Sequence, residues 1–178
     1  MRLFHFSDDP KIERFVARPV TVPSTRPEGK DWLNGPLVWA VDAWHAPPYL
    51  FPRECPRVLV WPKSDSTQAD IARYWHGRSC RMIAHIEWAW LERLRSTRLY
   101  RYELPVNGFE DLGDVGMHVH RGTVEPIGMV TLNDLPSELR AADVELRMME
   151  SLLALKGLWN TSLHVSGIRL RNAQGWDA

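Results

Sequence analysis

Short apolar runs, separated by segments rich in proline and glycine, are the dominant pattern along this chain. Side chains of a β-strand point alternately to the two faces of its sheet, so short alternating or apolar runs bounded by turn residues predict strands. We expect strands at residues 2–7, 37–41, 55–61, 81–86, 98–104, 117–124, 127–132, 144–148 and 163–171.

Helical spacing of apolar residues is confined to fewer segments. Over 87–95, Trp88, Leu91 and Leu94 recur every three residues, which predicts an apolar stripe facing a sheet. We expect further short helices or turns at 10–15 and 65–76, after a cap at Asn133 or Asp134, and at 151–159.

The order of these elements indicates the fold class. Strands outnumber helices and do not alternate with helices of regular length, as they do in doubly wound folds. We therefore predict an α+β protein with a mainly antiparallel twisted sheet or sheets and short helices. The proline- and glycine-rich stretch 18–36 predicts a surface loop, and 172–178 a frayed tail.

Length and composition favour one domain over residues 1–178. A chain of 178 residues with 44% apolar residues can bury a single substantial core. No run approaches the roughly 20 apolar residues of a membrane-spanning helix, and no signal-peptide pattern is found at the N-terminus. These features predict a cytoplasmic protein without a membrane partner.

Charge and cysteine content narrow the classes of partner. The 22 basic and 22 acidic residues balance to a formal charge of zero, so no global field attracts nucleic acid. Cys55 and Cys80 lack the spacing of a metal motif and are expected to be reduced structural thiols. Neither observation predicts a metal or a nucleic-acid partner.

The first strand carries the first candidate site residues. Alternation places Phe4 and Phe6 on one face and His5 and Ser7 on the other, so we predict an apolar core face behind a polar pair. An imidazole and a hydroxyl two residues apart can bind the hydroxyls of a ribose or an amide. The alternative is a solvated or backbone-bonded strand histidine.

Aromatic residues gather around the end of the second expected strand, at Trp39, Trp44, His45 and Tyr49. Such rings can stack on a flat ligand ring, and either Trp39 or Tyr49 is a candidate. Arg53 follows closely and can bind a phosphate through two hydrogen bonds. The alternatives are a core position for Trp39 and an ordinary loop position for Arg53.

The segment after residue 116 holds two further candidates. His118 and His120 project from the same strand face, as two metal ligands would, and a third ligand would have to come from His5, His85 or His164. Glu125 can stabilise positive charge on a ribose as a glycosidic bond lengthens. An exposed glutamate at a strand end is the alternative.

Six segments carry a resemblance to known proteins. The chain resembles a family of small bacterial proteins without an assigned activity, at LFHFS (3–7), GPLVWA (35–40), YLFPRECPRV (49–58), WLER (90–93), LYRYE (99–103) and IRLRNA (168–173). The order of its parts is similar to that of the ADP-ribosyltransferase superfamily: an early strand with a histidine, a second strand followed by a helix with an aromatic residue, and a late strand with an acid. His5 matches the histidine, Trp39 or Tyr49 could stand for the aromatic residue, and Glu125 is near the expected place of the acid.

This resemblance implies an ADP-ribosyltransferase-like fold with NAD as cofactor or substrate. It implies ribose bound by His5 and Ser7, nicotinamide stacked on Trp39 or Tyr49, and Glu125 as the catalytic acid for ADP-ribosyl transfer or NAD glycohydrolysis. Gly122 stands where an acid is expected, which leaves open whether the protein is an enzyme. Two alternatives remain: a non-catalytic binding module on the same fold, and a metal-dependent hydrolase that uses His118 and His120.

Overall fold

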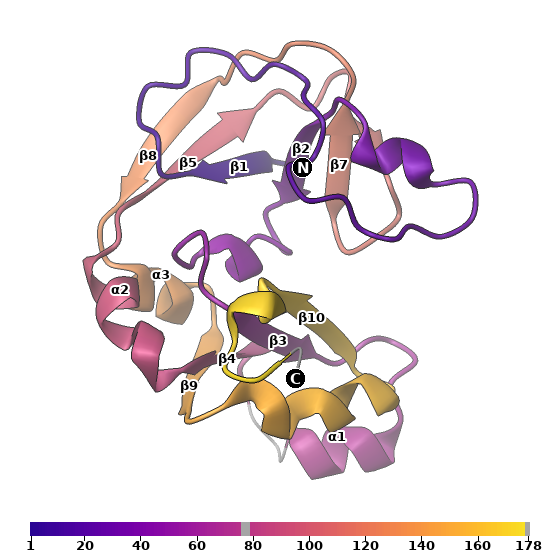
Figure 1. Cartoon of the computed structure of the whole chain (residues 1–178), viewed down its shortest axis with the longest axis vertical. Helices are drawn as coiled ribbons and strands as arrows, with labels where there is room; N and C mark the ends of the chain where they lie inside the picture. Colours follow the sequence, from indigo (N-terminus) through magenta and orange to yellow (C-terminus); the bar gives the residue numbers. More distant parts are fainter. Residues whose placement is uncertain (76–78, 177–178) are drawn as a thin grey trace. The chain divides into compact units, whose positions relative to one another are not determined.

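The computed structural model describes residues 1–75 and 79–176, and contacts divide the chain into two compact units (Figure 1). Unit 1 consists of Met1–Ala46 and Leu99–Leu132, and unit 2 of the described parts of Pro47–Arg98 and Asn133–Ala178. Each unit has its own sheet. The α+β class with short helices and mostly antiparallel sheets is confirmed. The single domain over 1–178 stays a prediction.

Unit 1 is built on a six-stranded sheet in the order β6-β7-β2-β1-β5-β8, in which every neighbouring pair is antiparallel. The strands are β1 (Leu3–Ser7), β2 (Val38–Asp42), β5 (Leu99–Leu104), β6 (Glu110–Asp111), β7 (Met117–His120) and β8 (Gly128–Leu132). The predicted strand at 117–124 therefore ends at His120, and Val124 forms only an isolated bridge to Phe15.

The main core of unit 1 lies on the face of the sheet that carries Leu3 and His5. A buried cluster there contains Leu3, Tyr102 and Val124, together with Phe15, Val38, Ala40 and Leu104. The predicted apolar face behind His5 is confirmed for Phe4, which is buried, whereas Phe6 is half-buried. The main cluster nevertheless lies on the face of His5, because β1 is a central strand covered on both faces.

The opposite face of this sheet is covered in part by the segment before β2. Leu33 and Leu37 cluster there with Val119, and Leu33 belongs to the 3₁₀ helix η1 (Asp31–Asn34). The stretch 18–36 was predicted to be an irregular loop, and this turn of helix is the exception. The predicted turn or helix at 10–15 contains no helix; Tyr102 Oη holds this segment by donating to Asp9 O and accepting from Ile12 N.

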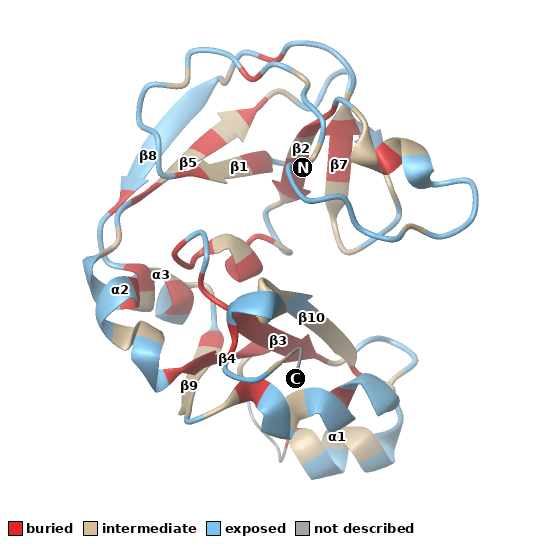
Figure 2. Ribbon diagram, viewed as in Figure 1, coloured by how far each residue is buried: buried red, intermediate tan, exposed pale blue. Residues whose placement is uncertain are grey.

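Unit 2 is built on a four-stranded sheet in the order β10-β3-β4-β9, with β4 and β9 parallel and the other pairs antiparallel. The strands are β3 (Arg57–Trp61), β4 (Met82–Glu87), β9 (Val144–Met149) and β10 (His164–Ile168). All residues of β3 and β4 are buried, whereas most of β8 in unit 1 is exposed (Figure 2). The two central strands of unit 2 are thus covered on both faces.

Short helices surround the sheet of unit 2. The α-helices are α1 (Gln68–Tyr74), α2 (Leu91–Ser96) and α3 (Leu135–Ala141), and the 3₁₀ helices are η2 (Pro47–Tyr49), η3 (Trp88–Trp90), η4 (Leu152–Asn160) and η5 (Leu170–Asn172). Asp134 caps α3 as predicted, because its carboxylate accepts from Ser137 N. No helix among the described residues is long and apolar enough to cross a membrane.

Three local predictions in unit 2 need correction. The helix over 87–95 is split into η3 and α2, and Trp88 is exposed while Leu94 is buried, so the apolar stripe is shorter than predicted. The strand over 163–171 ends at Ile168, because Arg169 adopts a left-handed backbone conformation with φ 57°. The described part of the tail is anchored, because Gln174 N donates to the buried carboxylate of Glu87.

Candidate functional site

The central strands β1 and β2 of unit 1 separate after a short paired stretch. They are paired at only two positions, the last of them Phe4 with Val41, although β1 continues to Ser7 and β2 begins at Val38. On its other side, β1 is paired with β5 over all five of its residues. We call the unpaired part of these neighbouring strands the β1–β2 separation.

His5 bridges this separation with its side chain. Its Nδ1 lies 2.9 Å from the backbone oxygen of Trp39. Because a carbonyl oxygen can only accept, Nδ1 carries the proton, and Nε2 of the neutral imidazole has a lone pair. The ring packs against Phe15 with 4.6 Å between ring centroids. These two contacts fix the orientation of the imidazole, with Nδ1 toward Trp39 O.

Trp39 lies at the same separation and has an unsatisfied donor. Its Nε1 atom is buried and has no hydrogen-bond partner among the described residues. The guanidinium of Arg26 lies over the indole ring, 5.6 Å from its centroid. A buried donor without an acceptor costs about 1–3 kcal/mol. A ligand oxygen at Nε1 would remove this cost.

Ser7, which was predicted to form a polar pair with His5, and Glu125 lie in different settings. Ser7 is buried, and its Oγ accepts from the backbone N of Asp9, so the hydroxyl holds the turn after β1. Glu125 is exposed and follows Val124, whose backbone forms two hydrogen bonds with Phe15, at 2.7 and 2.9 Å. Phe15 is thus shared: its ring contacts His5 and its backbone holds the segment that carries Glu125.

His118 and His120 share one face of β7, as predicted, because they pair with Ala40 and Val38 on β2. His118 is buried, and Nδ1 of His120 accepts from the backbone N of Gly122. Within the described ranges, no group of three or more His, Cys, Asp or Glu side chains could hold a metal ion. The structure therefore adds no third ligand to this pair.

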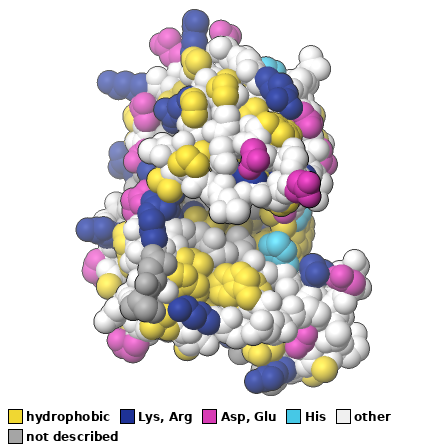
Figure 3. All heavy atoms as spheres, turned by 45° about the vertical axis from the view of Figure 1, so that its right-hand side comes forward, with side chains coloured by type: hydrophobic (Ala, Val, Ile, Leu, Met, Phe, Trp, Pro, Cys, Tyr) yellow, Lys and Arg dark blue, Asp and Glu magenta, His cyan; other side chains and the backbone are white. Residues whose placement is uncertain are grey.

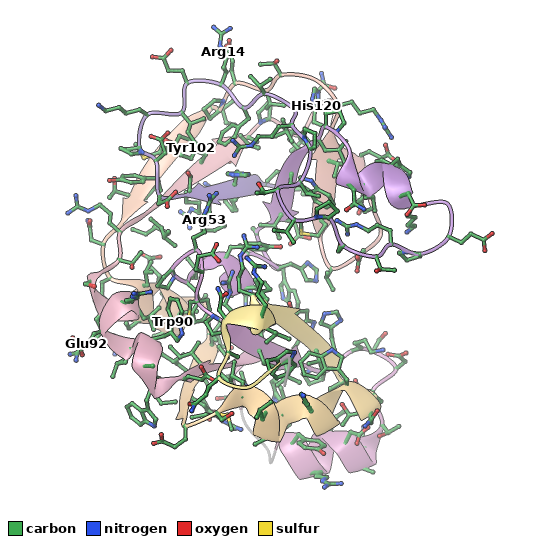
Figure 4. The ribbon with its side chains drawn as sticks, viewed as in Figure 1. Arg14, Arg53, Trp90, Glu92, Tyr102 and His120 are labelled. Carbon is green, nitrogen blue, oxygen red and sulfur yellow. The ribbon has the colours of Figure 1, made fainter. Side chains whose placement is uncertain are left out.

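Tyr49 and Arg53 belong to unit 2, whereas the other predicted site residues belong to unit 1. Tyr49 ends η2 and is half-buried, and Arg53 is exposed in the following loop (Figure 4). The side chain of Asn172, followed by nearby arginines that include Arg53, lowers the pKa of Glu54. Arg53 therefore lies in a charged surface cluster of unit 2.

Arg169 and Arg171 belong to the same surface cluster. Both form ion pairs with Glu54, at 3.4 and 3.2 Å. Neither arginine lies on the edge of a strand, because β10 ends at Ile168. Elsewhere, basic and acidic side chains are interspersed over the face in view (Figure 3), in keeping with a formal charge of zero.

An Asp–His pair at the end of β2 was not among the predicted site residues. Asp42 Oδ1 accepts from the backbone N of His45 at 2.8 Å, and His45 Nδ1 lies 3.0 Å from both carboxylate oxygens. Burial acts to raise the pKa of Asp42, but the hydrogen bonds from His45 outweigh it and lower that pKa. The spacing of Asp and His three residues apart after a strand was the available signal.

Glycine makes this pair possible. A Cβ atom at Gly116 would lie 2.3 Å from His45 Nδ1 and 2.4 Å from Asp42 Oδ2, and Gly116 has φ +69°. The backbone oxygen of Gly116 also accepts from Asp42 N at 2.9 Å. The turn between β6 and β7 thus packs directly on the Asp42–His45 pair.

Comparison with known proteins gives one match. The model of a family described as "Family of unknown function (DUF6886)" matches residues 4–173. No curated protein and no solved structure matches the chain. The match includes every residue of the β1–β2 separation, and it assigns no activity to them.

Proposed function

The chain belongs to the DUF6886 family, whose function is unknown, and from its own geometry we propose that unit 1 binds NAD or a related nucleotide at the β1–β2 separation. The observation that carries this proposal is the pair of oriented groups there: the acceptor Nε2 of His5 and the unsatisfied donor Nε1 of Trp39. A ligand that bonds to both groups needs a hydroxyl donor and an oxygen acceptor.

The nicotinamide riboside half of NAD meets both requirements. A ribose hydroxyl can donate to His5 Nε2, and the carboxamide oxygen can accept from Trp39 Nε1. Arg26 lies over the ring of Trp39 and carries the positive charge that a phosphate needs. The same residues suit ADP-ribose less well, because it lacks the carboxamide.

The two side chains approach the separation from opposite faces. The ring of His5 contacts Phe15 on the core face, whereas Trp39 packs with Leu33, Leu37 and Val119 on the other. A ligand that touches both must therefore reach both faces of the sheet where β1 and β2 are unpaired. A ligand on one face would depend on only one of the two residues, and this gives the proposal a sharp test.

The binding proposal is tested by calorimetric titration of the full chain with NAD. His5→Asn keeps a donor toward Trp39 O but removes the acceptor Nε2, and Trp39→Phe removes only the indole N–H and part of the ring. We expect each change to weaken NAD binding by about tenfold, the loss of one hydrogen bond in a desolvated site. Trp32→Phe is the matched control, because Trp32 also has an arginine over its ring.

Three results would contradict the proposal. Absence of heat with NAD at millimolar concentration would remove it outright. If His5→Asn or Trp39→Phe bound NAD as tightly as the wild type, the ligand would contact only one face of the sheet. Equal affinity for NAD and ADP-ribose would remove the role of the carboxamide.

Glu125 connects this binding proposal to a reaction. In that reaction, water or another acceptor bonds to the ribose carbon of NAD and nicotinamide leaves with the electron pair of the broken bond. The carboxylate of Glu125 would hold a ribose hydroxyl and stabilise the positive charge that develops on the ribose. The support is the shared residue Phe15, which touches His5 and holds the segment next to Glu125. Release of nicotinamide, measured by chromatography, should be lost in Glu125→Gln while NAD binding is kept.

A non-catalytic binding module is the second candidate. The exposed position of Glu125 favours it, since no hydrogen bond or ion pair of this side chain to a described residue holds it in place. NAD binding without nicotinamide release from the wild-type protein would support it. The ADP-ribosyltransferase-like fold, the roles of Tyr49 and Arg53, cytoplasmic location and bacterial origin stay predictions.

A further inference from the structure

Unit 2 contains a cavity that no sequence motif indicated. Its volume is about 130 Å³. The apolar walls come from β3, β4 and η4: Val60, Ile83, Ala154, Leu155 and Leu158. Three polar side chains also line it, namely Tyr74 of α1, His85 of β4 and Arg147 of β9. The cavity thus lies between one face of the sheet and the helices that cover it.

His85 is buried and has an unused acceptor. It is only 4% exposed, and its Nδ1 lies 3.1 Å from the backbone oxygen of Val58. The carbonyl can only accept, so Nδ1 carries the proton and Nε2 the lone pair. No described residue forms a hydrogen bond with Nε2. Burial lowers the pKa of His85 to about 4, so the ring is neutral at pH 7.

Arg147 supplies the positive charge of the cavity. It pairs with His85 in the parallel ladder between β4 and β9, so both side chains lie on the same face of the sheet. Its Nε donates to Glu145 Oε1 at 2.8 Å. Its two terminal nitrogens form no hydrogen bond with a described residue. The hydroxyl of Tyr74 likewise has no partner among the described residues.

The size and charge of the cavity select the ligand. An apolar cavity of about 150 Å³ holds benzene, so this one has room for about six non-hydrogen atoms. One guanidinium, already paired with Glu145, suits a single negative charge better than the double charge of a phosphate. The acceptor Nε2 of His85 requires a hydroxyl or N–H donor on the same ligand.

We propose that this cavity binds a small hydroxycarboxylate. Its carboxylate accepts from the terminal nitrogens of Arg147 and from the hydroxyl of Tyr74, and its hydroxyl donates to Nε2 of His85. The aliphatic part of the ligand packs against Ile83 and Leu155. This site lies wholly within unit 2 and is independent of the nucleotide site proposed in unit 1.

The first experiment is a calorimetric titration of the full chain with lactate. Propanoate lacks the hydroxyl and lactamide lacks the charge, so each should bind at least about tenfold more weakly than lactate. Arg147→Gln should also weaken lactate binding by about tenfold. Arg95→Gln is the matched control, because Arg95 forms a similar pair with Glu92 on the surface of α2.

A second measurement does not depend on a folded variant. In the wild-type protein, the imidazole nitrogen resonances of His85 should move on addition of lactate and stay in place with propanoate. Gly157→Ala adds a methyl group where no heavy atom lies within 4 Å, so the fold should be kept while the cavity shrinks and lactate binds more weakly.

The proposal is overturned by any of four results. These are no heat and no His85 shift with lactate, equal binding of lactate and propanoate, unchanged binding in Arg147→Gln, or tighter binding of inorganic phosphate than of lactate. Absence of heat and of a His85 shift would mean that there is no site, and equal binding of propanoate would mean that His85 has no role. Unchanged binding in Arg147→Gln would exclude a role for Arg147, and tighter binding of phosphate would exclude the hydroxycarboxylate class.

Discussion

His5 in unit 1 and His85 in unit 2 make the same hydrogen bond in different settings. Each directs Nδ1 to a backbone oxygen on a neighbouring strand, at 2.9 and 3.1 Å respectively. His5 does so where β1 and β2 are no longer paired, and it is half-buried. His85 does so inside the continuous ladder between β3 and β4, and it is almost fully buried. The hydrogen bond is thus the same in both units, while strand pairing decides how far the ring is buried.

Two glutamates, Glu87 in unit 2 and Glu103 in unit 1, also differ in burial. Glu87 in unit 2 is buried and accepts from the backbone N of Leu152 and of Gln174. Glu103 in unit 1 forms an ion pair with Arg2 at the surface, at 2.6 Å. A buried acceptor that satisfies backbone donors contributes far more than an exposed pair.

The largest effect is expected for Glu87→Ala. The change leaves the buried backbone N–H of Leu152 and the part-buried N–H of Gln174 without their acceptor. It should lower the free energy of unfolding by about 4 kcal/mol. Glu87→Gln keeps an oxygen acceptor and should cost about 1 kcal/mol. Urea unfolding followed by tryptophan fluorescence measures both, and equal stability of the two variants would deny that the carboxylate holds these segments.

The second effect is a loss of stability at low pH that originates from His85. Burial, with a smaller contribution from Arg147, holds the pKa of His85 at about 4, below the ordinary value of 6.5, while the hydrogen bond to Val58 and the charge of Glu145 oppose this. The unfolded chain therefore binds this proton first as the pH falls. The contribution of His85 is complete above about pH 6.5 and is lost toward pH 4, a change of roughly 3 kcal/mol.

His85→Phe isolates this contribution. Other groups, such as Asp42, also contribute less to stability in acid. The relevant quantity is therefore the difference in the free energy of unfolding between the wild type and the variant. Between pH 7 and pH 4 the free energy of unfolding should fall less in His85→Phe than in the wild type, by roughly 3 kcal/mol. A His85 imidazole that titrates near pH 6.5 in the folded protein would refute the assignment.

Strand positions could be predicted from the sequence because alternation is a local property. Residues 2–7 and 98–104 were predicted as strands, and the structure has β1 at Leu3–Ser7 and β5 at Leu99–Leu104. Which face of β1 carries the main core could not be predicted. Both faces are covered, with Leu3 at 0% and Phe4 at 4% exposure, and alternation alone does not rank two apolar faces.

The candidate sites show the same limit. His5 was recognisable as a histidine within an apolar strand, whereas His85 in the run 82–86 carries the same signal but was named only as a possible third metal ligand. The cavity beside His85 is formed by segments as far apart as Val60 and Leu158. No local spacing encodes such an assembly, since tertiary packing alone brings these residues together.

The third prediction concerns the Asp42–His45 pair in unit 1. In Gly116→Ala the new methyl group would collide with both side chains, and the positive φ adds backbone strain, so we expect a loss of about 2 kcal/mol. Gly113→Ala is the matched control, because Gly113 has φ +63° but nothing within 4 Å of a Cβ atom. It should cost about 1 kcal/mol. Equal losses would mean that the pair contributes nothing to the effect.

The smallest effect is expected for Glu103→Ala, the counterpart in unit 1 of the change at Glu87. Glu103 accepts two hydrogen bonds from Arg2, which lower its pKa, but both side chains are solvated. Their charges are therefore screened by salt, and thermal unfolding of the variant should match the wild type at about 0.5 M salt. At low salt any difference should shrink as the pH falls through the pKa of Glu103. A loss as large as that of Glu87→Ala would break the contrast between the units, because an exposed ion pair would then stabilise the fold as much as a buried carboxylate that holds two backbone donors.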